Sequence, residues 1–226
     1  MTLRRFLKIV GSFTALAVIV LVGMLTTSPR GQASSEGFEQ VEIRRGFAIA
    51  PVPLNLEGRN RDLVGLGSYI VNAQADCNGC HSAGPRTEFA MGGNPYFGQP
   101  TKFNQATYLG GGNDFGPFPA PGFPNIFSRN LTPDKTGRPE GGRTFEQFVQ
   151  IFRTGADLDH IHPTCSPTVT TNCLPPPFNG DLLQIMPWPL YKNMTSRDLR
   201  AIYEYLSAIP CIEGPPAPSI LHNDCQ

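Results

Sequence analysis

Charge is scarce in this sequence, and neither sign is in excess. Asp, Glu, Lys and Arg make up 16% of the 226 residues, and 18 acidic side chains balance 18 basic ones. A neutral chain is not expected to bind nucleic acid through bulk positive charge. Strand-like alternation of apolar and polar side chains is also lacking, and no internal repeat is visible. The sequence therefore favours an all-α fold with few short helices.

Glycine and proline, by contrast, are abundant, with 24 and 23 copies. Their share stays below that of disordered chains, and 40% hydrophobic residues are enough to bury a core. Many of these helix breakers lie between residues 83 and 142, together with nine aromatic side chains. Aromatic residues are rare in disordered linkers. We therefore expect a long, ordered Gly/Pro/aromatic-rich loop that covers the core.

The first 33 residues predict a segment that directs the chain to a membrane. An apolar run over 9–25 follows three basic residues, and a helix of that length spans about 26 Å, close to the thickness of a bilayer core. We expect an uncleaved transmembrane helix; the alternative is a signal peptide cleaved near 31–33. The first interpretation places the chain in the bacterial inner membrane as a single-pass protein with residues 34–226 on the periplasmic side. The second makes it a soluble periplasmic protein.

Residues 77–81 form a C-x-x-C-H sequence, which is typical of c-type haem attachment. In such a site the thiols of Cys77 and Cys80 form thioethers to haem vinyl groups, and His81 is the proximal iron ligand. A redox dithiol and half of a zinc site are the alternatives, but the surroundings show neither a βαβ setting nor a second close ligand pair. The single motif predicts one covalent haem c.

The sixth iron ligand is expected to be Met186, because electron-transfer cytochromes commonly pair His with Met. Prolines on both sides of Trp188 hold the following segment extended and rigid, which suits a strap that aims a sulfur atom. Met91 follows His81 too closely to reach the other haem face. Met194 suits a hydrophobic staple before the last helix. A core methionine remains the alternative for Met186.

Three histidines outside the motif, His160, His162 and His222, are alternative ligands that would give a bis-His haem. Their positions are more typical of solvated loop residues or hydrogen-bond partners.

The remaining cysteines are disulfide candidates, because disulfides form in exported proteins. Short separations in the sequence favour pairing Cys165 with Cys173 and Cys211 with Cys225. Four cysteines allow three pairings. Each favoured pair closes a loop that contains proline.

Three helices are marked by their ends. Asp62 is expected to cap the first, a capping box at Thr144 begins the second, and Gly155 ends it. The last helix is expected to start at Thr195 and to stop before Pro210.

Two glycines in the first helix, Gly65 and Gly67, predict close contact with another helix. The expected organisation is a signal-anchor or transmembrane segment over 1–33, a linker over 34–59, a haem domain over 60–210 and a disulfide-tethered tail over 211–226.

Residues 60–210 carry a series of segments in a recognisable order and spacing. They are Gly67–Val71, Cys77–His81, Ser128–Asp134, Phe152–Gly155, Met186–Trp188 and Asp198–Leu206. In these segments the chain resembles class I c-type cytochromes, and most closely the monohaem cytochrome c subunits of bacterial membrane-bound dehydrogenases and related exported electron carriers. The resemblance supports Met186 as the axial ligand. The Cys165–Cys173 insertion and the tail after Pro210 depart from it.

The function expected from this site is the transfer of single electrons by a His/Met-ligated haem, without chemistry on a small-molecule substrate. The partners are exported or membrane redox proteins. An alternative is a fixed electron-transfer subunit of a respiratory, photosynthetic or dehydrogenase complex. A haem enzyme with an open sixth position is a further alternative. We expect no nucleic acid partner.

Overall fold

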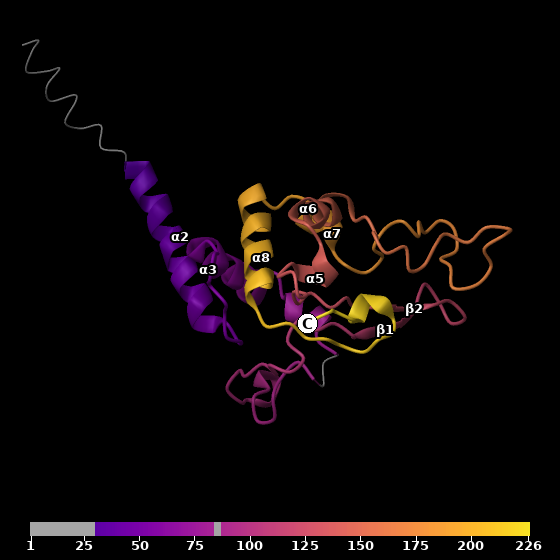
Figure 1. The fold of residues 1–226 in the computed structure, drawn as a ribbon, viewed down its shortest axis with the longest axis horizontal. Helices are drawn as coiled ribbons and strands as arrows, with labels where there is room; N and C mark the ends of the chain where they lie inside the picture. Colours follow the sequence, from indigo (N-terminus) through magenta and orange to yellow (C-terminus); the bar gives the residue numbers. More distant parts are fainter. Residues whose placement is uncertain (1–29, 84–86) are drawn as a thin grey trace, which may run out of the picture. The chain divides into compact units, whose positions relative to one another are not determined.

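Short helices and long irregular segments alternate along the chain. The computed structural model describes residues 30–83 and 87–226, and the chain divides into two units after Gln40. The elements are α2 (Arg30–Ile49), α3 (Arg61–Tyr69), a π-helical turn (Ile70–Gln74), α4 (Cys77–His81), β1 (Asp114–Pro117), β2 (Asn125–Phe127), α5 (Pro139–Gly142), α6 (Phe145–Thr154), α7 (Trp188–Tyr191) and α8 (Ser196–Ala208), with 3-10 turns at Pro95–Phe97 and Ser219–Leu221 (Figure 1). The packing described below lies within residues 41–226.

The centre of the core is the contact between α3 and α8, which lie side by side (Figure 1). A Cβ placed on Gly67 would stand only 1.9 Å from the carbonyl oxygen of Ala201, so only glycine permits this approach. Gly65 packs in the same way against Ile43 of α2. The close packing predicted from these two glycines is confirmed.

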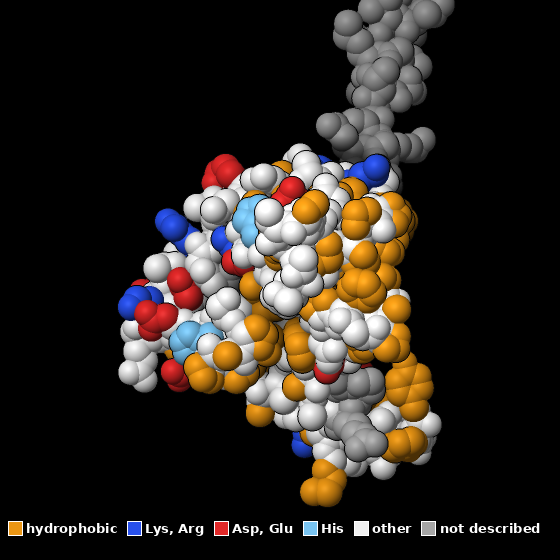
Figure 2. Space-filling model, turned by 90° about the vertical axis from the view of Figure 1, so that its right-hand side faces the viewer, with side chains coloured by type: hydrophobic (Ala, Val, Ile, Leu, Met, Phe, Trp, Pro, Cys, Tyr) orange, Lys and Arg blue, Asp and Glu red, His pale blue; other side chains and the backbone are white. Residues whose placement is uncertain are grey.

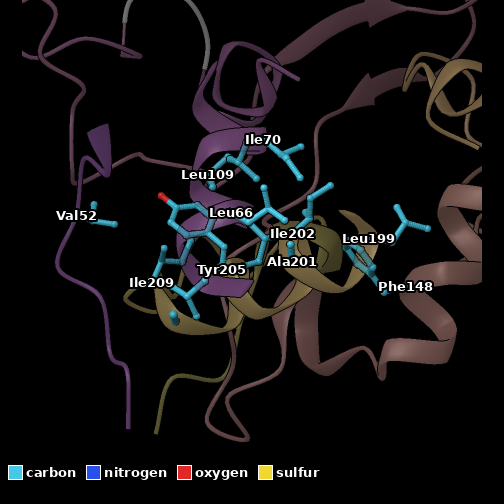
Figure 3. Packing of buried hydrophobic residues seen from close by; sticks show 14 of the residues in the cluster. Val52, Leu66, Ile70, Leu109, Phe148, Leu199, Ala201, Ile202, Tyr205 and Ile209 are labelled. Carbon is cyan, nitrogen blue, oxygen red and sulfur yellow. The ribbon is translucent and has the colours of Figure 1, made fainter. Parts of the chain in front are cut away.

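Around this contact lies a cluster of fully buried side chains (Figure 3). It includes Val64, Phe148, Leu199, Ile202 and Tyr205, each no more than 1% exposed. The cluster joins α3, α6 and α8 into one layer. Burying such side chains is the main source of folding free energy in a domain of this kind.

Helix ends follow the capping rules with one difference. The predicted capping boxes are confirmed at Thr144 of α6 and Thr195 of α8, and Gly155 ends α6 in a left-handed conformation. The cap of α3, however, is Asn60 and not Asp62: its side chain accepts hydrogen bonds from two backbone N–H groups of the first turn. Both residue types suit this position, so their order in the sequence did not decide between them.

The expected all-α fold is wrong, because the described residues include a two-stranded antiparallel sheet formed by β1 and β2. The strands have only four and three residues, which is too short for a pattern of alternating side chains to show. The side chain of Asn125 donates to both carboxylate oxygens of Asp114 across the pair. The sheet lies within the glycine- and proline-rich loop.

The expected transmembrane helix also needs correction. Within residues 30–83 and 87–226, no helix is both long and apolar enough to cross a membrane. The apolar run 9–25 that carried the prediction lies outside the described residues. The first described helix, α2, covers residues 30–49 and so includes part of the segment expected to be a linker; its Ile43 is buried.

Two disulfides fasten irregular segments. Cys165 is bonded to Cys173 and Cys211 to Cys225, the pairs that short separations favour. The tail is further held by Asn223, whose side chain donates to the carbonyl and hydroxyl oxygens of Thr132. Residues 211–226 are therefore an integral part of this unit.

Candidate haem site

One cavity of about 230 Å³ brings together four residues that are distant in the sequence. Cys77, Cys80 and His81 line it from α4, and Met186 lines it from the segment before α7. The rest of the wall is mainly apolar. The apolar side chains are Phe115, Ile126, Phe127, Leu131, Phe148, Ile151, Phe152, Leu183, Ile185, Tyr191, Ile202 and Leu206.

Asp76 and Asn78, the residues on either side of Cys77, fix the direction of the side chains in the short helix α4. Asp76, at its N-terminus, adopts a left-handed conformation with φ 47°, which turns the chain sharply out of the π-helical turn. The side-chain oxygen of buried Asn78 then accepts the backbone N–H of Leu109 at 3.0 Å. This places both thiols and the imidazole on the cavity side. At Gly79 a Cβ would lie 2.7 Å from the Asp76 carboxylate, so a larger residue would displace that side chain.

The imidazole of His81 is oriented by a single hydrogen bond. Its Nδ1 lies 2.8 Å from the carbonyl oxygen of Arg129, which can only accept, so Nδ1 carries the proton and Nε2 is left as the ligating nitrogen. Burial lowers the pKa of His81 to about 4. A neutral imidazole with one nitrogen free is the form that binds iron.

The two thiols of the motif are free and do not form a disulfide with each other. Burial, assisted by the Asp76 carboxylate, raises the pKa of Cys77 to about 12 and raises the pKa of Cys80 as well. Redox dithiols have lowered pKa values because their thiolate is the nucleophile. The surroundings of Cys77 and Cys80 are therefore opposite to those of a redox dithiol.

The segment that carries Met186 is anchored to the end of α6. The backbone N–H of Leu183 donates to the carbonyl of Gly155, and the indole N–H of Trp188 donates to the carbonyl of Leu183. Gly155 touches the indole ring so closely that a Cβ there would lie 2.3 Å from it. Met186 is thus held from both sides. The extended conformation expected for the segment with the two prolines is wrong from Trp188 onward, because Trp188–Tyr191 form the short helix α7, and a proline in the first turn suits a helix start.

The other candidate ligands lie elsewhere. Met91 is 100% exposed, and Met194 packs beside the core before α8. Of the histidines, His160 is an exposed neighbour of Asp181, whereas His162 lines a smaller, adjoining cavity and is absent from the lining of the main one. Among the residues that line the main cavity, Met186 is the one methionine, and His81 is the one histidine. Tyr191 also lines it, but its hydroxyl donates to the carbonyl of Ala75.

An ion cluster beside the cavity was not found from the sequence. The guanidinium of Arg129 binds Asp157 at 2.5 Å and also binds Asp159, which in turn binds Arg143. Glu140, whose carboxylate lies 3.8 Å from Nε of Arg129, completes the cluster. Arg129 and Glu140 both line the cavity. The residues of this ion cluster come from three separate segments of the chain, so no spacing in the sequence connects them.

Comparison with known proteins gives two distant relatives. The chain is 26% identical over 147 residues to a fructose dehydrogenase cytochrome subunit of Gluconobacter japonicus, covering 65% of this chain and 21% of that protein. It is 29% identical over 147 residues to a gluconate 2-dehydrogenase cytochrome c subunit of Pantoea cypripedii, covering 65% of this chain and 23% of that protein. No family model and no solved structure matches.

These matches relate the chain to cytochrome c subunits of dehydrogenases. The chain spans between a fifth and a quarter of the length of these two relatives. A cytochrome c relationship implies haem c as the cofactor, and the cavity fits it: free thiols and a neutral imidazole stand on one wall within an apolar, aromatic lining.

Proposed function

We propose that this protein is a monohaem class I c-type cytochrome that transfers single electrons as the cytochrome part of a dehydrogenase complex. The observation that carries the proposal is the single cavity lined by Cys77, Cys80, His81 and Met186. The relationship to dehydrogenase cytochrome subunits supports the complex. When bound, haem supplies an iron that exchanges one electron between its ferric and ferrous states.

The residues of the chain have separate tasks in this proposal. Cys77 and Cys80 hold the cofactor covalently, which prevents its loss from an exported protein. His81, oriented by the carbonyl of Arg129, and Met186, held by its strap, would both bind the haem iron, so the iron would serve electron exchange and not substrate binding. The apolar wall excludes water, which disfavours the more highly charged oxidised state and raises the potential.

Electron transfer to a partner requires a surface next to the site. Cys80 is exposed at the rim of the cavity, as is Phe115 of β1 at 38% exposure. In the one face that Figure 2 shows, hydrophobic side chains gather toward one margin and most charged side chains toward the other. Exposed apolar area of this kind is typical of protein interfaces. We propose that the partner is another protein subunit, and that the two disulfides reflect a periplasmic location.

The test is covalent haem content. The chain is produced in a bacterium with an active cytochrome c maturation system, and haem is measured by peroxidase staining of a denaturing gel and by the pyridine haemochrome spectrum. We expect one haem per chain, and complete loss of covalent haem in the Cys77→Ser/Cys80→Ser variant. The matched control, Cys165→Ser/Cys173→Ser, removes a cysteine pair outside the cavity and should keep the haem. A wild-type chain without covalent haem would contradict the proposal.

A further inference from the structure

A buried carboxylate stands in the cavity wall, and the haem-binding residues do not use it. Glu140 is 8% exposed and lines the same cavity as His81 and Met186. Carboxylates are seldom buried unless they are paired. The 3.8 Å separation from Nε of Arg129 is longer than a hydrogen bond, so this pairing is weak.

The nearby positive charges are already bound by other acids. Arg129 donates to Asp157 and Asp159, and Arg143 donates to Asp159. The charged groups around Glu140 are thus Arg129, Arg143 and Asp157, with Asp159 behind them. Three carboxylates share two guanidinium groups, so the cluster holds one negative charge in excess when every acid is ionised.

The backbone at this position is strained. Glu140 has φ 50° and ψ 56°, the left-handed region that non-glycine residues rarely adopt, and it is followed by two glycines in the same region. A glycine at position 140 would avoid this strain. The chain carries a glutamate there instead, and its carboxylate faces Arg129 of the ion cluster. Such outliers concentrate at functional positions.

We propose that Glu140 is a proton-binding site linked to the oxidation state of the haem, a step that rests on the proposed function. When a one-electron donor protein reduces the ferric iron to the ferrous state, the Glu140 carboxylate takes up one proton from water. Reoxidation releases that proton. One electron and one proton enter together, so the net charge within the cavity does not change.

The physical reason is the loss of one positive charge at the iron on reduction. An ionised Glu140 stabilises the ferric state and a protonated Glu140 does not, so reduction must favour protonation. Burial, only partly offset by Arg129, raises the pKa of Glu140, which supports a carboxyl group that titrates above the range of an exposed one.

The experiment is a redox titration of the haem-loaded protein, followed by its visible spectrum at a series of pH values. The proposal gives Glu140 one pKa with the haem oxidised and a higher pKa with the haem reduced. Between these two values, the equilibrium constant for reduction should fall tenfold per pH unit, which is about 59 mV for a one-electron couple. Glu140→Gln should give a flat potential over that range, equal to the acid limit of the wild type. Glu146→Gln, at an exposed position of α6, is the matched control and should keep the wild-type slope.

Infrared difference spectra give a second readout that does not depend on a variant. The reduced-minus-oxidised spectrum of wild-type protein labelled with 13C-glutamate should contain a shifted band from a protonated carboxylic acid. A flat wild-type potential, an unchanged slope in Glu140→Gln, or the absence of that band would each overturn the inference while leaving the cytochrome assignment intact. Absence of haem from the wild type would instead overturn the proposed function.

Discussion

The cavity has two walls that are built in different ways. One wall consists of regular helices, where α6 and α8 contribute Phe148, Ile151 and Ile202. These side chains are placed by helical periodicity and by capping boxes. The other wall consists of irregular chain, where Arg129 and Met186 are placed by backbone hydrogen bonds and ion pairs. Helices α6 and α8 supply apolar surface and α4 supplies His81, whereas the irregular wall supplies the carbonyl that orients His81 and the side chain of Met186.

This difference shows why so much glycine and proline is compatible with an ordered site. An irregular segment can direct a side chain at an angle that a helix does not offer, because its backbone dihedral angles are not fixed at helical values. Gly155 joins the two walls, because it ends α6 and also contacts the ring of Trp188, the first residue of α7 directly after the strap. Changes in the helical wall should therefore affect stability, and changes in the irregular wall should affect the spectrum and the potential.

The largest effect is expected from Met186→Ala in the irregular wall, which removes the sixth ligand that we propose for the haem iron. The ferric haem should become high-spin, lose its Met–iron charge-transfer band completely and, once reduced, bind carbon monoxide. The absorption spectrum with and without carbon monoxide measures this. Met91→Ala, at a fully exposed position, is the control and should change nothing. An unchanged spectrum in Met186→Ala would rule out this ligand.

Next in size is Gly67→Ala in α3, at the helix contact that supports the helical wall through α8. Its Cβ would meet the backbone of Ala201, so α3 and α8 must move apart at a cost of about 2 kcal/mol in the free energy of unfolding. Urea unfolding followed by circular dichroism measures the loss, and the haem spectrum should stay the same. Gly37→Ala in α2, where no atom lies within 4 Å of the new Cβ, should show no loss.

Gly155→Ala is expected to affect both walls moderately. A left-handed alanine costs about 1 to 2 kcal/mol, and the new methyl group pushes against Trp188. Because Trp188 holds the strap, the charge-transfer band of the Met186–iron bond should shift or weaken as stability falls. The two measurements together test the coupling: a stability loss with an unaltered band would show that the walls are independent.

The smallest effect is a pH dependence of stability caused by Glu140. Its pKa is raised in the folded protein, so the folded state binds the proton more tightly than the unfolded state. The stability that this tighter proton binding adds is fully present below pH 4.5, the ordinary pKa of a glutamate. It is lost as the pH rises through the pKa of Glu140 in the folded protein. Glu140→Gln should therefore gain stability over the wild type from acid to neutral pH. Urea unfolding at several pH values measures the difference, and parallel curves would contradict it.

The sequence predicted those elements that local rules define. The caps at Thr144 and Thr195 and the close approach at Gly67 follow from residue type alone and are confirmed. Local rules did not predict the short sheet, because its strands are too short for a pattern. They also missed the cap at Asn60, because a second suitable acceptor stands two residues later.

By itself the sequence indicated the cofactor chemistry, because two thiols and an imidazole stand at the spacing of a haem-attachment motif. The tertiary structure decided what surrounds them. It brought Met186 to the same cavity over a separation of more than 100 residues, and it chose the carbonyl of Arg129 to orient His81. It also buried Glu140 beside two arginines that are paired with other carboxylates. Contacts between distant irregular segments depend on packing and charge balance in three dimensions, and no local pattern encodes them.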